Sequence, residues 1–357
     1  MFVLKKKKKI LIVKCSSLGD ILQAFVVIEY LSDRLPHATI DWLVEKNYEE
    51  LVRSHPKIDE IIGITLKGAA AHLLSFFRQI ILLRKKKYDW IFDLQGNSKS
   101  SFFTLLARGG KKIGFGKKTV REWPNIFATH IRFDPDPRKN MRQQYLEIVQ
   151  KFLQDPHPYR LHGHLLTVTR PEERKYCEAL LQQEDSFRVM VAPSSRWENK
   201  KLSHGFWRSF LEKIALEKDP FFYFIWGSEK EKREVAELSA LFSKSMVVEK
   251  LSLPAVQTVM SKMDLLLAVD SCMLHLAATL PHIATFSLFG PTQSEVFNPE
   301  GKQHAAFQGK CVFGHTFLKS CSHLRTCSTG SCLKRVSFAE IEPVWNSFKG
   351  IINEKQR

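Results

Sequence analysis

The sequence has no apolar run near the ~20 residues that a membrane-spanning helix needs. A secretory signal requires an apolar segment behind its positive residues, and the stretch at residues 10–13 is too short for one. These absences predict a cytoplasmic protein. Its seven cysteines are then expected to be mostly reduced thiols.

Acidic residues are scarce relative to basic ones. The chain has 54 lysines and arginines against 37 aspartates and glutamates, a formal net charge of +17. Such an excess indicates an acidic partner, which could be nucleic acid, an anionic membrane surface or a phosphate-rich substrate. The basic residues gather at 5–9, 84–87, 117–118 and 200–201. We interpret the run at 5–9 as a solvated lead into a strand.

Length and composition predict two folded domains. A chain of 357 residues is too long for one typical core. With 44% hydrophobic and 25% charged residues, the composition is that of an ordinary globular protein.

Apolar strand-like runs alternate with stretches of helical periodicity, which predicts parallel strands joined by right-handed crossovers in an open α/β sheet. Strands are expected at 10–14, 40–44, 61–64, 90–94, 187–192, 221–226, 265–269 and 284–289, and helices at 20–35 and 98–107. A proline-rich linker is expected at 154–171. Ligands of such sheets bind at the carboxyl ends of the strands, so the loops there should carry the chemistry.

The first polar loop, residues 14–20, follows the first predicted strand. Ser17 or Asp20 could cap the following helix, with Gly19 as a turn residue. Alternatively, small residues here let a sugar hydroxyl approach while Asp20 accepts its proton. An aspartate is a weak base unless burial or closure of a cleft raises its pKa.

A second polar loop, residues 93–100, contains Gln95, and its Asn97 or Ser98 could cap a helix. The functional alternative is that this loop faces the same crevice as Asp20. Arg121, close to two lysines, could bind acceptor phosphates in a bidentate manner.

In the second half, Ser194, Ser195 and Lys200 follow a predicted strand and suit a diphosphate, whose departure needs positive charge. Asp270 and Ser271 lie where a strand becomes a helix, whose N-terminal amides could bind phosphate. A lone His275 is usually a core residue, but its spacing from Asp270 favours a functional role.

The order of the motifs resembles one family. SSLGD, DLQG-x-x-KS, SRW-x-x-K, WG-x-x-x-E, DS-x-x-x-H-x-A and FGPT, beginning at residues 16, 93, 195, 226, 270 and 289, resemble glycosyltransferase family 9, the ADP-heptose:lipopolysaccharide heptosyltransferases. The resemblance extends over residues 10–289. It implies two Rossmann-like domains facing across a cleft, the GT-B architecture, at 1–160 and 171–335. A terminal helix at 336–357 would pack back on the first domain.

The resemblance also implies roles for individual residues. Asp20 matches the base that deprotonates the acceptor, and Lys200 matches the lysine that contacts the donor diphosphate. The remaining donor-side residues are Ser194, Ser195, Glu231, Leu251, Asp270, Ser271 and His275, with Glu231 expected on the ribose and Leu251 on the adenine. The remaining acceptor-side residues are Ser17, Gly19, Gln95 and Arg121.

Two features of the cysteines bear on these roles. The family usually has glycine where this sequence has Cys272, so a side chain there could crowd the diphosphate. In the tail, Cys311, Cys321, Cys327 and Cys332 are spaced too widely and irregularly for usual structural zinc sites. A local structural role is the preferred interpretation of these four, and zinc binding the alternative.

The resemblance thus implies an inverting transferase that moves heptose from ADP-heptose to the lipid A–Kdo inner core of lipopolysaccharide. No carboxylate-rich metal motif is evident, so neither metal nor cofactor is expected. The cationic surface could help the enzyme contact the cytoplasmic face of the inner membrane. One alternative keeps the fold with another nucleotide sugar or acidic glycan. A non-catalytic nucleic-acid-binding protein is disfavoured, because basic–aromatic interleaving is missing.

Overall fold

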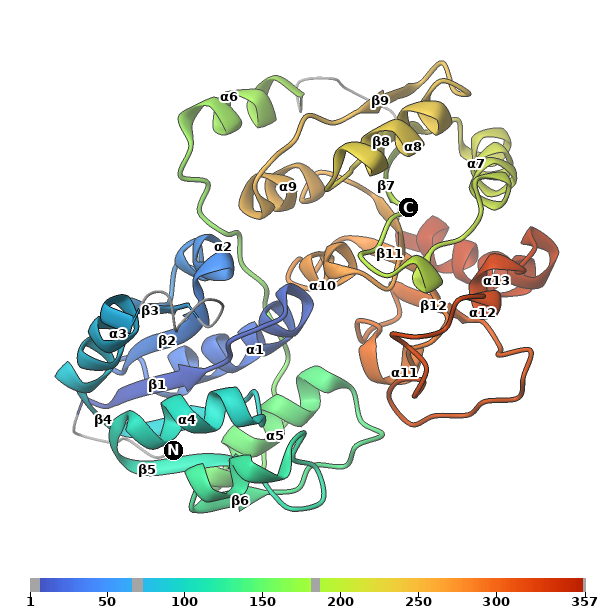
Figure 1. Ribbon diagram of the computed structural model, residues 1–357. Coiled ribbons are helices and arrows are strands. Elements are labelled where there is room, and N and C mark those ends of the chain that lie inside the picture. Colours follow the sequence, from blue (N-terminus) through green and yellow to red (C-terminus); the bar gives the residue numbers. More distant parts are fainter. Residues whose placement is uncertain (1–6, 66–72, 181–186, 356–357) are drawn as a thin grey trace. The chain divides into compact units, whose positions relative to one another are not determined.

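The structure is a computed structural model that describes residues 7–65, 73–180 and 187–355. The chain divides into two compact units, Met1–His162 and Gly163–Arg357 (Figure 1). Of the predicted lysine lead at 5–9, Lys5 and Lys6 lie outside the described residues, and the first strand begins at Lys9.

Unit 1 is built on a six-stranded parallel sheet with the order β3-β2-β1-β4-β5-β6. The strands are β1 (Lys9–Val13), β2 (Thr39–Glu45), β3 (Glu60–Ile64), β4 (Lys87–Asp93), β5 (Arg108–Phe115) and β6 (Ile131–Phe133). The central strands carry apolar residues on both faces, as helices on both sides of a parallel sheet require. Four consecutive residues of β1, from Ile10 to Val13, are fully buried.

The helical segments of unit 1 are α1 (Leu18–Arg34), η1 (Lys46–Tyr48), α2 (Glu49–Arg53), α3 (Leu73–Lys85), α4 (Ser98–Leu106), η2 (Trp123–Ala128) and α5 (Met141–Leu153). The α3 and α4 helices cover the same face of the sheet, where Leu83 and Phe103 pack with Leu11 and Val13. The α1 helix packs against α5.

Unit 2 repeats this topology. Its parallel sheet has the order β12-β11-β10-β7-β8-β9, which is the strand order of unit 1 counted from the other edge. The strands are β7 (Arg188–Ala192), β8 (Phe221–Phe224), β9 (Ser245–Val247), β10 (Leu265–Val269), β11 (Ala284–Phe289) and β12 (His304–Gln308). Both units therefore have the order of a Rossmann-like domain.

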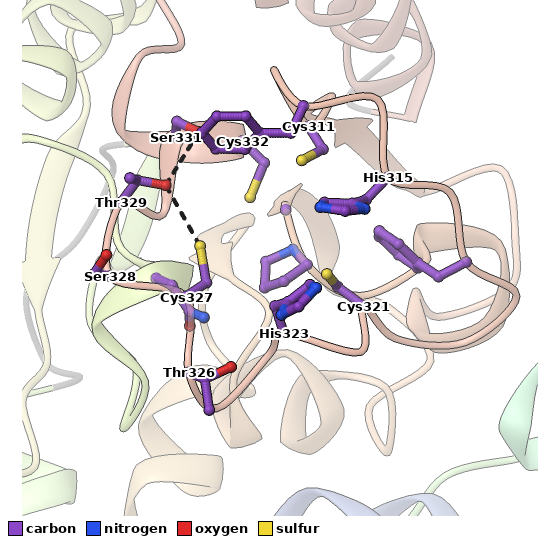
Figure 2. A pocket seen from close by; sticks show the side chains of 15 residues that line it. Cys311, His315, Cys321, His323, Thr326, Cys327, Ser328, Thr329, Ser331 and Cys332 are labelled. Carbon is purple, nitrogen blue, oxygen red and sulfur yellow. Dashed lines mark hydrogen bonds between the residues drawn. The ribbon is translucent and has the colours of Figure 1, made fainter.

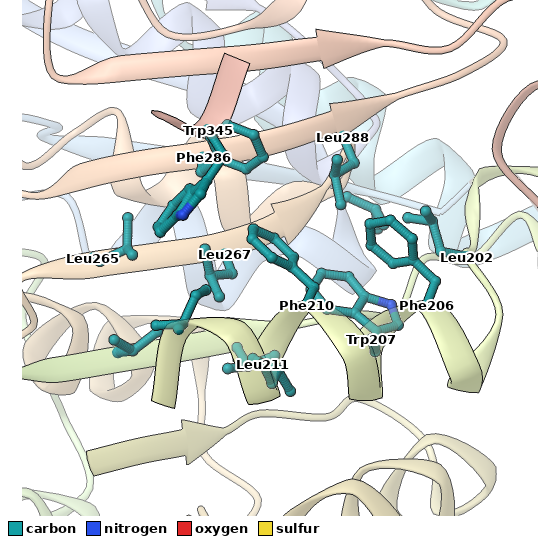
Figure 3. Close-up of a cluster of buried hydrophobic side chains, with 14 of the residues drawn as sticks. Leu202, Phe206, Trp207, Phe210, Leu211, Leu265, Leu267, Phe286, Leu288 and Trp345 are labelled. Atoms are coloured by element: carbon teal, nitrogen blue, oxygen red, sulfur yellow. The ribbon is translucent and has the colours of Figure 1, made fainter. Parts of the chain in front are cut away.

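The helical segments of unit 2 are α6 (Pro171–Leu180), η3 (Glu198–Lys200), α7 (His204–Lys218), α8 (Glu229–Ser239), α9 (Leu253–Met260), α10 (Cys272–Ala277), α11 (Ser294–Phe297), α12 (Ser331–Lys334) and α13 (Phe338–Lys355). We predicted the last helix to pack on the N-terminal domain. Instead, its apolar face lies in the core of unit 2, where Trp345 meets Phe210 and Phe286 edge to face, with ring centroids 5.3 and 5.2 Å apart (Figure 3). Phe210 belongs to α7 and Phe286 to β11, and their rings form the apolar surface on which Trp345 packs.

The predicted alternation of strands and helices is confirmed. Each predicted strand is present, and α1 and α4 occupy the two segments with helical periodicity. Residues 155–170, inside the predicted linker, have neither helix nor strand, and the boundary between the two units falls among them. None of the described helices has the length and apolar character needed to cross a membrane.

Candidate active site

In unit 1, the predicted site residues follow three neighbouring strands. Asp20 comes after β1, Gln95 after β4 and Arg121 after β5. Because the strands are parallel, these residues share one edge of the sheet, the edge where open α/β sheets bind ligands. The structure therefore brings together the acceptor-side residues that the sequence predicted.

Asp20 both caps α1 and carries a charge at this edge. Ser17 is the N-cap residue, and its amide and hydroxyl donate hydrogen bonds of 3.1 and 3.0 Å to Asp20 Oδ2. The two interpretations of the loop are thus compatible, since the capping bonds fix the orientation of the carboxylate. Gly19 accepts a hydrogen bond from Gln23 within the first turn of the helix.

The electrostatic surroundings of Asp20 differ from the expectation for a catalytic base. Burial acts to raise its pKa, but the Lys14 ammonium, the two hydrogen bonds from Ser17 and the Arg121 guanidinium together outweigh burial. The pKa of Asp20 therefore lies below its ordinary value of 3.8. Of the two conditions named for a stronger base, burial alone does not raise this pKa within unit 1. Asp20 is fully ionised at neutral pH and available to accept a proton.

No role was predicted for Lys14 from the sequence, although it is the first residue of this loop. This lysine is 2% exposed, and its Nζ donates to Tyr145 Oη at 2.8 Å and to the Leu94 carbonyl at 3.2 Å. Burial lowers the pKa of Lys14, while the Asp20 carboxylate acts to raise it. A lysine at the end of an apolar strand is unusual, so the sequence could have marked Lys14 as a functional residue. Tyr145 lies on α5, more than a hundred residues away, and no sequence pattern indicates its contact with Lys14.

Gln95 positions the first loop. Its side-chain oxygen accepts hydrogen bonds of 3.1 Å from the amides of both Cys15 and Ser16. Asp93, which the sequence analysis did not select, in turn accepts from the amides of Gln95 and Gly96 through one carboxylate oxygen. The other oxygen of Asp93 accepts from Thr104 and Asn125, which joins β4, α4 and η2. A buried carboxylate with four donors can hold the two polar loops in fixed register.

Arg121 is exposed and lies beside the second loop. The amide of its neighbour Glu122 donates to the Gly96 carbonyl at 2.9 Å. Gly96 has a φ of +68°, a conformation that other residues rarely adopt, and a Cβ there would lie 3.1 Å from the Phe115 ring. Asn97 caps α4 by accepting from the Ser100 amide at 3.0 Å, as one interpretation of this loop predicted.

In unit 2, the predicted donor residues meet around one buried carboxylate. Asp270 follows β10, Lys200 lies in η3 after β7, and Thr292 follows β11, so three adjacent strands contribute. Lys200 Nζ and Thr292 Oγ1 both bond to Asp270 Oδ2, and His275 Nε2 lies 3.7 Å from Oδ1. Burial acts to raise the pKa of Asp270, but the Lys200 and His275 contacts hold it far below its ordinary value.

The other donor-side residues lie on loops at the same edge of the unit 2 sheet. Ser194 and Ser195 follow β7, and Leu251 follows β9. Glu231 closes a capping box at the start of α8, with Oε2 accepting from the amides of Gly227 and Ser228. Ser271 is the N-cap of α10, and its buried hydroxyl has no hydrogen-bond partner within the described part of the chain. A buried hydroxyl with unused bonding capacity suits a ligand oxygen.

Cys272 begins α10, directly after Ser271. Burial raises the pKa of its thiol to about 11, and the nearby carboxylates of Glu231 and Asp270 add to this effect. The thiol therefore remains protonated and apolar at neutral pH.

The four tail cysteines line one cavity of about 290 Å³ in unit 2, together with His315 and His323 (Figure 2). In the described residues all seven cysteines are free thiols, and no three histidine, cysteine or acidic side chains are arranged to hold a metal ion. The loop around the cavity adjoins the donor-side network. Asn199, beside Lys200, donates to the Leu324 carbonyl at 2.6 Å, and Thr292 forms an antiparallel bridge with Ser320.

Cys327 should be alkylated more readily than Cys272. A hydrogen bond with the Thr329 hydroxyl and one from the Gly330 amide lower its pKa, whereas burial raises the pKa of Cys272 to about 11. The thiolate is the reactive form. We expect a short iodoacetamide pulse at pH 8 to label Cys327 at least about tenfold faster than Cys272, because lower nucleophilicity offsets only part of the larger thiolate fraction. Peptide mass spectrometry measures both rates. In urea the alkylation rates of Cys327 and Cys272 should become equal. Equal rates in the folded protein would show that Cys327 is not the more reactive thiol.

Comparison with known proteins identifies the family to which the chain belongs. The sequence profile described as Glycosyltransferase family 9 (heptosyltransferase) matches residues 75–325. Among curated proteins, lipopolysaccharide heptosyltransferase 1 of Campylobacter coli is 27% identical over 298 residues, covering 80% of this chain and 85% of the relative. The enzyme of the same name from Pseudomonas aeruginosa is 24% identical over 326 residues, covering 89% and 88%.

Solved structures agree on the fold. E. coli heptosyltransferase WaaC with ADP-2-deoxy-2-fluoro heptose aligns with a TM-score of 0.71 at 22% identity, covering 85% of this chain and 93% of that one. A family 9 glycosyl transferase from Veillonella parvula aligns with a TM-score of 0.75 at 15% identity, covering 96% and 97%. The two Rossmann-like units are thus those of a GT-B glycosyltransferase. The chain belongs to glycosyltransferase family 9, the heptosyltransferase family.

Proposed function

We propose that this enzyme transfers heptose from ADP-heptose to an acceptor sugar of the lipopolysaccharide inner core, with inversion at the anomeric carbon. The names of its relatives support the sugar and the acceptor class. The observation that carries the proposal is the ionised Asp20 at the edge of unit 1, held by Ser17 through Oδ2. A fixed carboxylate beside small residues suits the removal of a proton from a sugar hydroxyl.

The reaction is a direct displacement. As the acceptor oxygen bonds to the anomeric carbon of heptose, its proton passes to Asp20, and the bond from that carbon to the diphosphate oxygen breaks. A low pKa makes Asp20 a weak base, but the acceptor proton becomes acidic only as the new bond forms, so transfer is late in the step. Negative charge develops on the departing ADP.

Lys200 is the group proposed to stabilise that charge. In the structure it is paired with Asp270, which orients the ammonium but also neutralises it. The donor diphosphate would share the ammonium with Asp270. Ser194 and Ser195 after β7, Ser271 at the N-cap of α10 and His275 within α10 are proposed to complete the donor site. Glu231 and Leu251 are proposed to contact the ribose and the adenine.

The acceptor is proposed to bind at the polar loops of unit 1. Ser17, Gly19 and Gln95 shape the approach to Asp20, and Arg121 contacts acceptor phosphates. A lipid-linked acceptor also implies peripheral contact with the cytoplasmic face of the inner membrane.

A donor screen tests the proposal. ADP or UDP release is measured from ADP-heptose, ADP-glucose, UDP-glucose and UDP-N-acetylglucosamine, with and without a purified lipid A–Kdo acceptor. We expect acceptor-dependent ADP release from ADP-heptose above all other donors. NMR of the product should show the anomeric configuration inverted. Preferred turnover of a UDP-sugar would refute the donor, and a retained configuration would refute the displacement.

One observation favours a second candidate with a different donor sugar. Cys272 places a side chain where the family usually has glycine, at the start of α10 and one residue from Ser271. A Cys272→Gly variant with improved turnover of ADP-heptose relative to wild type would indicate that the native pocket is shaped for another sugar.

A further inference from the structure

Unit 1 exposes a concentration of large apolar side chains on α3, α4 and η2. Seven of the thirteen large hydrophobic residues exposed in the described part of the chain lie on these three elements. They are Phe77, Ile81 and Leu82 on α3, Phe102 and Leu105 on α4, and Trp123 and Phe127 on η2. Trp123 is 59% exposed and Phe127 67% exposed, and their rings lie edge to face with centroids 5.1 Å apart.

The three elements are neighbours, since α4 contacts both α3 and η2, and their exposed surface is here called the α3–α4–η2 face. Arg84 on α3 donates to the Leu106 carbonyl at the end of α4, at 3.0 Å. Ser101 on α4 donates to the Pro124 carbonyl in η2, at 3.3 Å. Since Leu83 and Phe103 on the inner sides of α3 and α4 pack on the sheet, the exposed residues point away from it.

Basic residues outnumber acidic ones in the segments that form and border this surface. From Leu94 to Arg121 the chain has seven basic residues and no aspartate or glutamate. They are Lys99, Arg108, Lys111, Lys112, Lys117, Lys118 and Arg121. Lys111 does not belong to the face, because its ammonium lies over the Phe152 ring of α5, on the other side of the sheet. On α3, Arg78, Arg84 and Lys85 are exposed and no acidic residue occurs. Two acidic residues border these segments: Glu122 accepts hydrogen bonds from Ser98, and Asp134 accepts from the amides of Lys118 and Thr119.

We propose that the α3–α4–η2 face docks on the anionic surface of a lipid bilayer. Tryptophan and phenylalanine side chains enter the boundary between headgroups and acyl chains, while lysine and arginine are attracted to anionic headgroups. This proposal rests on the proposed function in one respect: a lipid-linked acceptor is the reason for the enzyme to approach a membrane. The loops that carry Gln95 and Arg121 adjoin α4 and η2, so docking brings the acceptor side of unit 1 to the membrane surface.

Two other occupants fit the observations less well. A second copy of the chain, packed face to face, would place the basic residues of each copy against those of the other. A nucleic acid would satisfy the charges but would leave Ile81 and Leu82 without apolar contacts, because its binders stack aromatic residues on bases. A bilayer provides both the apolar layer and the negative charge.

The test is sedimentation of the full-length protein with vesicles, without donor or acceptor. Vesicles of phosphatidylglycerol and phosphatidylcholine are compared with vesicles of phosphatidylcholine alone. One face variant combines Trp123→Ser with Phe127→Ser, and another combines Arg78→Glu with Lys85→Glu. Leu216→Ser with Leu241→Ser and Lys302→Glu with Lys310→Glu are matched controls, because all four residues are exposed in unit 2.

We expect wild type to bind the anionic vesicles more tightly than the neutral ones, and added salt to weaken binding. The charge variant should bind about 25-fold more weakly or worse, at about fivefold per basic residue lost. The aromatic variant should lose about tenfold. Both control variants should bind like wild type. Equal binding to both vesicle types, or an equal loss in the controls, would overturn the proposal.

Two further measurements separate the possible failures. Sedimentation equilibrium that shows a dimer dissociated by Trp123→Ser with Phe127→Ser would assign the face to a second copy and overturn membrane docking. ADP release with a deacylated, soluble core acceptor should be the same in wild type and in the face variants. If ADP release were missing in all of them while vesicle binding followed the expected pattern, the proposed function would fail and the docking surface would stand.

Discussion

Replacing Asp20 with alanine is expected to lower kcat by about 100- to 10,000-fold, the contribution of a positioned general base. The variant removes the carboxylate that would receive the acceptor proton, while donor binding in unit 2 loses no contact. Initial rates of ADP release from ADP-heptose measure the effect. The KM for the donor should change little, because the lost interaction belongs to the transition state.

The control for this substitution is Asp20→Asn, which keeps an acceptor for the Ser17 capping bonds but cannot take a proton. If capping alone were the role of Asp20, the asparagine variant would retain most of the activity and the alanine variant would be mainly unstable. Thermal unfolding of both variants distinguishes the two cases, since loss of a helix cap costs about 1 kcal/mol. Full transfer activity in either variant would refute the base assignment.

The pH dependence gives an independent measurement of the same carboxylate. The pKa of Asp20 lies below 3.8, so the active, ionised form is complete at neutral pH and is lost only as the pH falls through that low value. The acid limb of kcat/KM from Asp20 should therefore lie below about pH 4. In Lys14→Met this limb should move to higher pH, because the ammonium that favours the ionised form is gone.

The second large effect is expected for Lys200→Met. The substitution removes the positive charge proposed to stabilise the departing diphosphate, and it leaves the buried Asp270 carboxylate without its main partner. We expect kcat to fall by about 100- to 1,000-fold. Stability should also fall, by up to about 3 kcal/mol, since breaking a buried ion pair leaves an uncompensated charge. Steady-state rates and urea unfolding measure the two effects.

Lys201→Met is the matched control, because Lys201 pairs with Glu198 and Glu234, whose side chains are 61% and 40% exposed, whereas that of Asp270 is 7% exposed. It should change kcat less than about twofold and stability by less than about 1 kcal/mol. A double-mutant cycle with Asp270→Asn separates the roles of the pair. In the double variant stability should recover relative to Lys200→Met, while transfer should stay low. Recovery of transfer as well would show that Lys200 acts only by neutralising Asp270.

The sequence predicted the central parts of both sheets, because their strands are short apolar runs bounded by turn and polar residues. It did not predict β5, β6, β9 or β12. The β5 segment contains three glycines and two lysines, and β6 and β9 have three residues each. Such strands depend on hydrogen bonds from a neighbouring strand already in place, which no local pattern records.

Much of the candidate site followed from the sequence, since residues at the ends of parallel strands must share one edge of the sheet. The motifs placed Asp20 and Gln95 at one edge, and Lys200 and Asp270 at another, whereas Arg121 reaches the first edge through β5, which was not predicted. Their partners could not be predicted in this way. Tyr145 lies on α5, and the periodicity of that helix predicts which of its faces is apolar but not that Tyr145 contacts Lys14.

The sequence by itself determined the α/β alternation, the linker and the identity of the charged residues after each strand. Tertiary structure alone decided the sign of the pKa shift of Asp20, because burial and the charges of Lys14 and Arg121 oppose each other and their balance depends on distance. It also decided where the last helix packs. An amphipathic pattern shows that a helix has an apolar face, but only the shape of the available surface selects its partner, here the aromatic residues of unit 2.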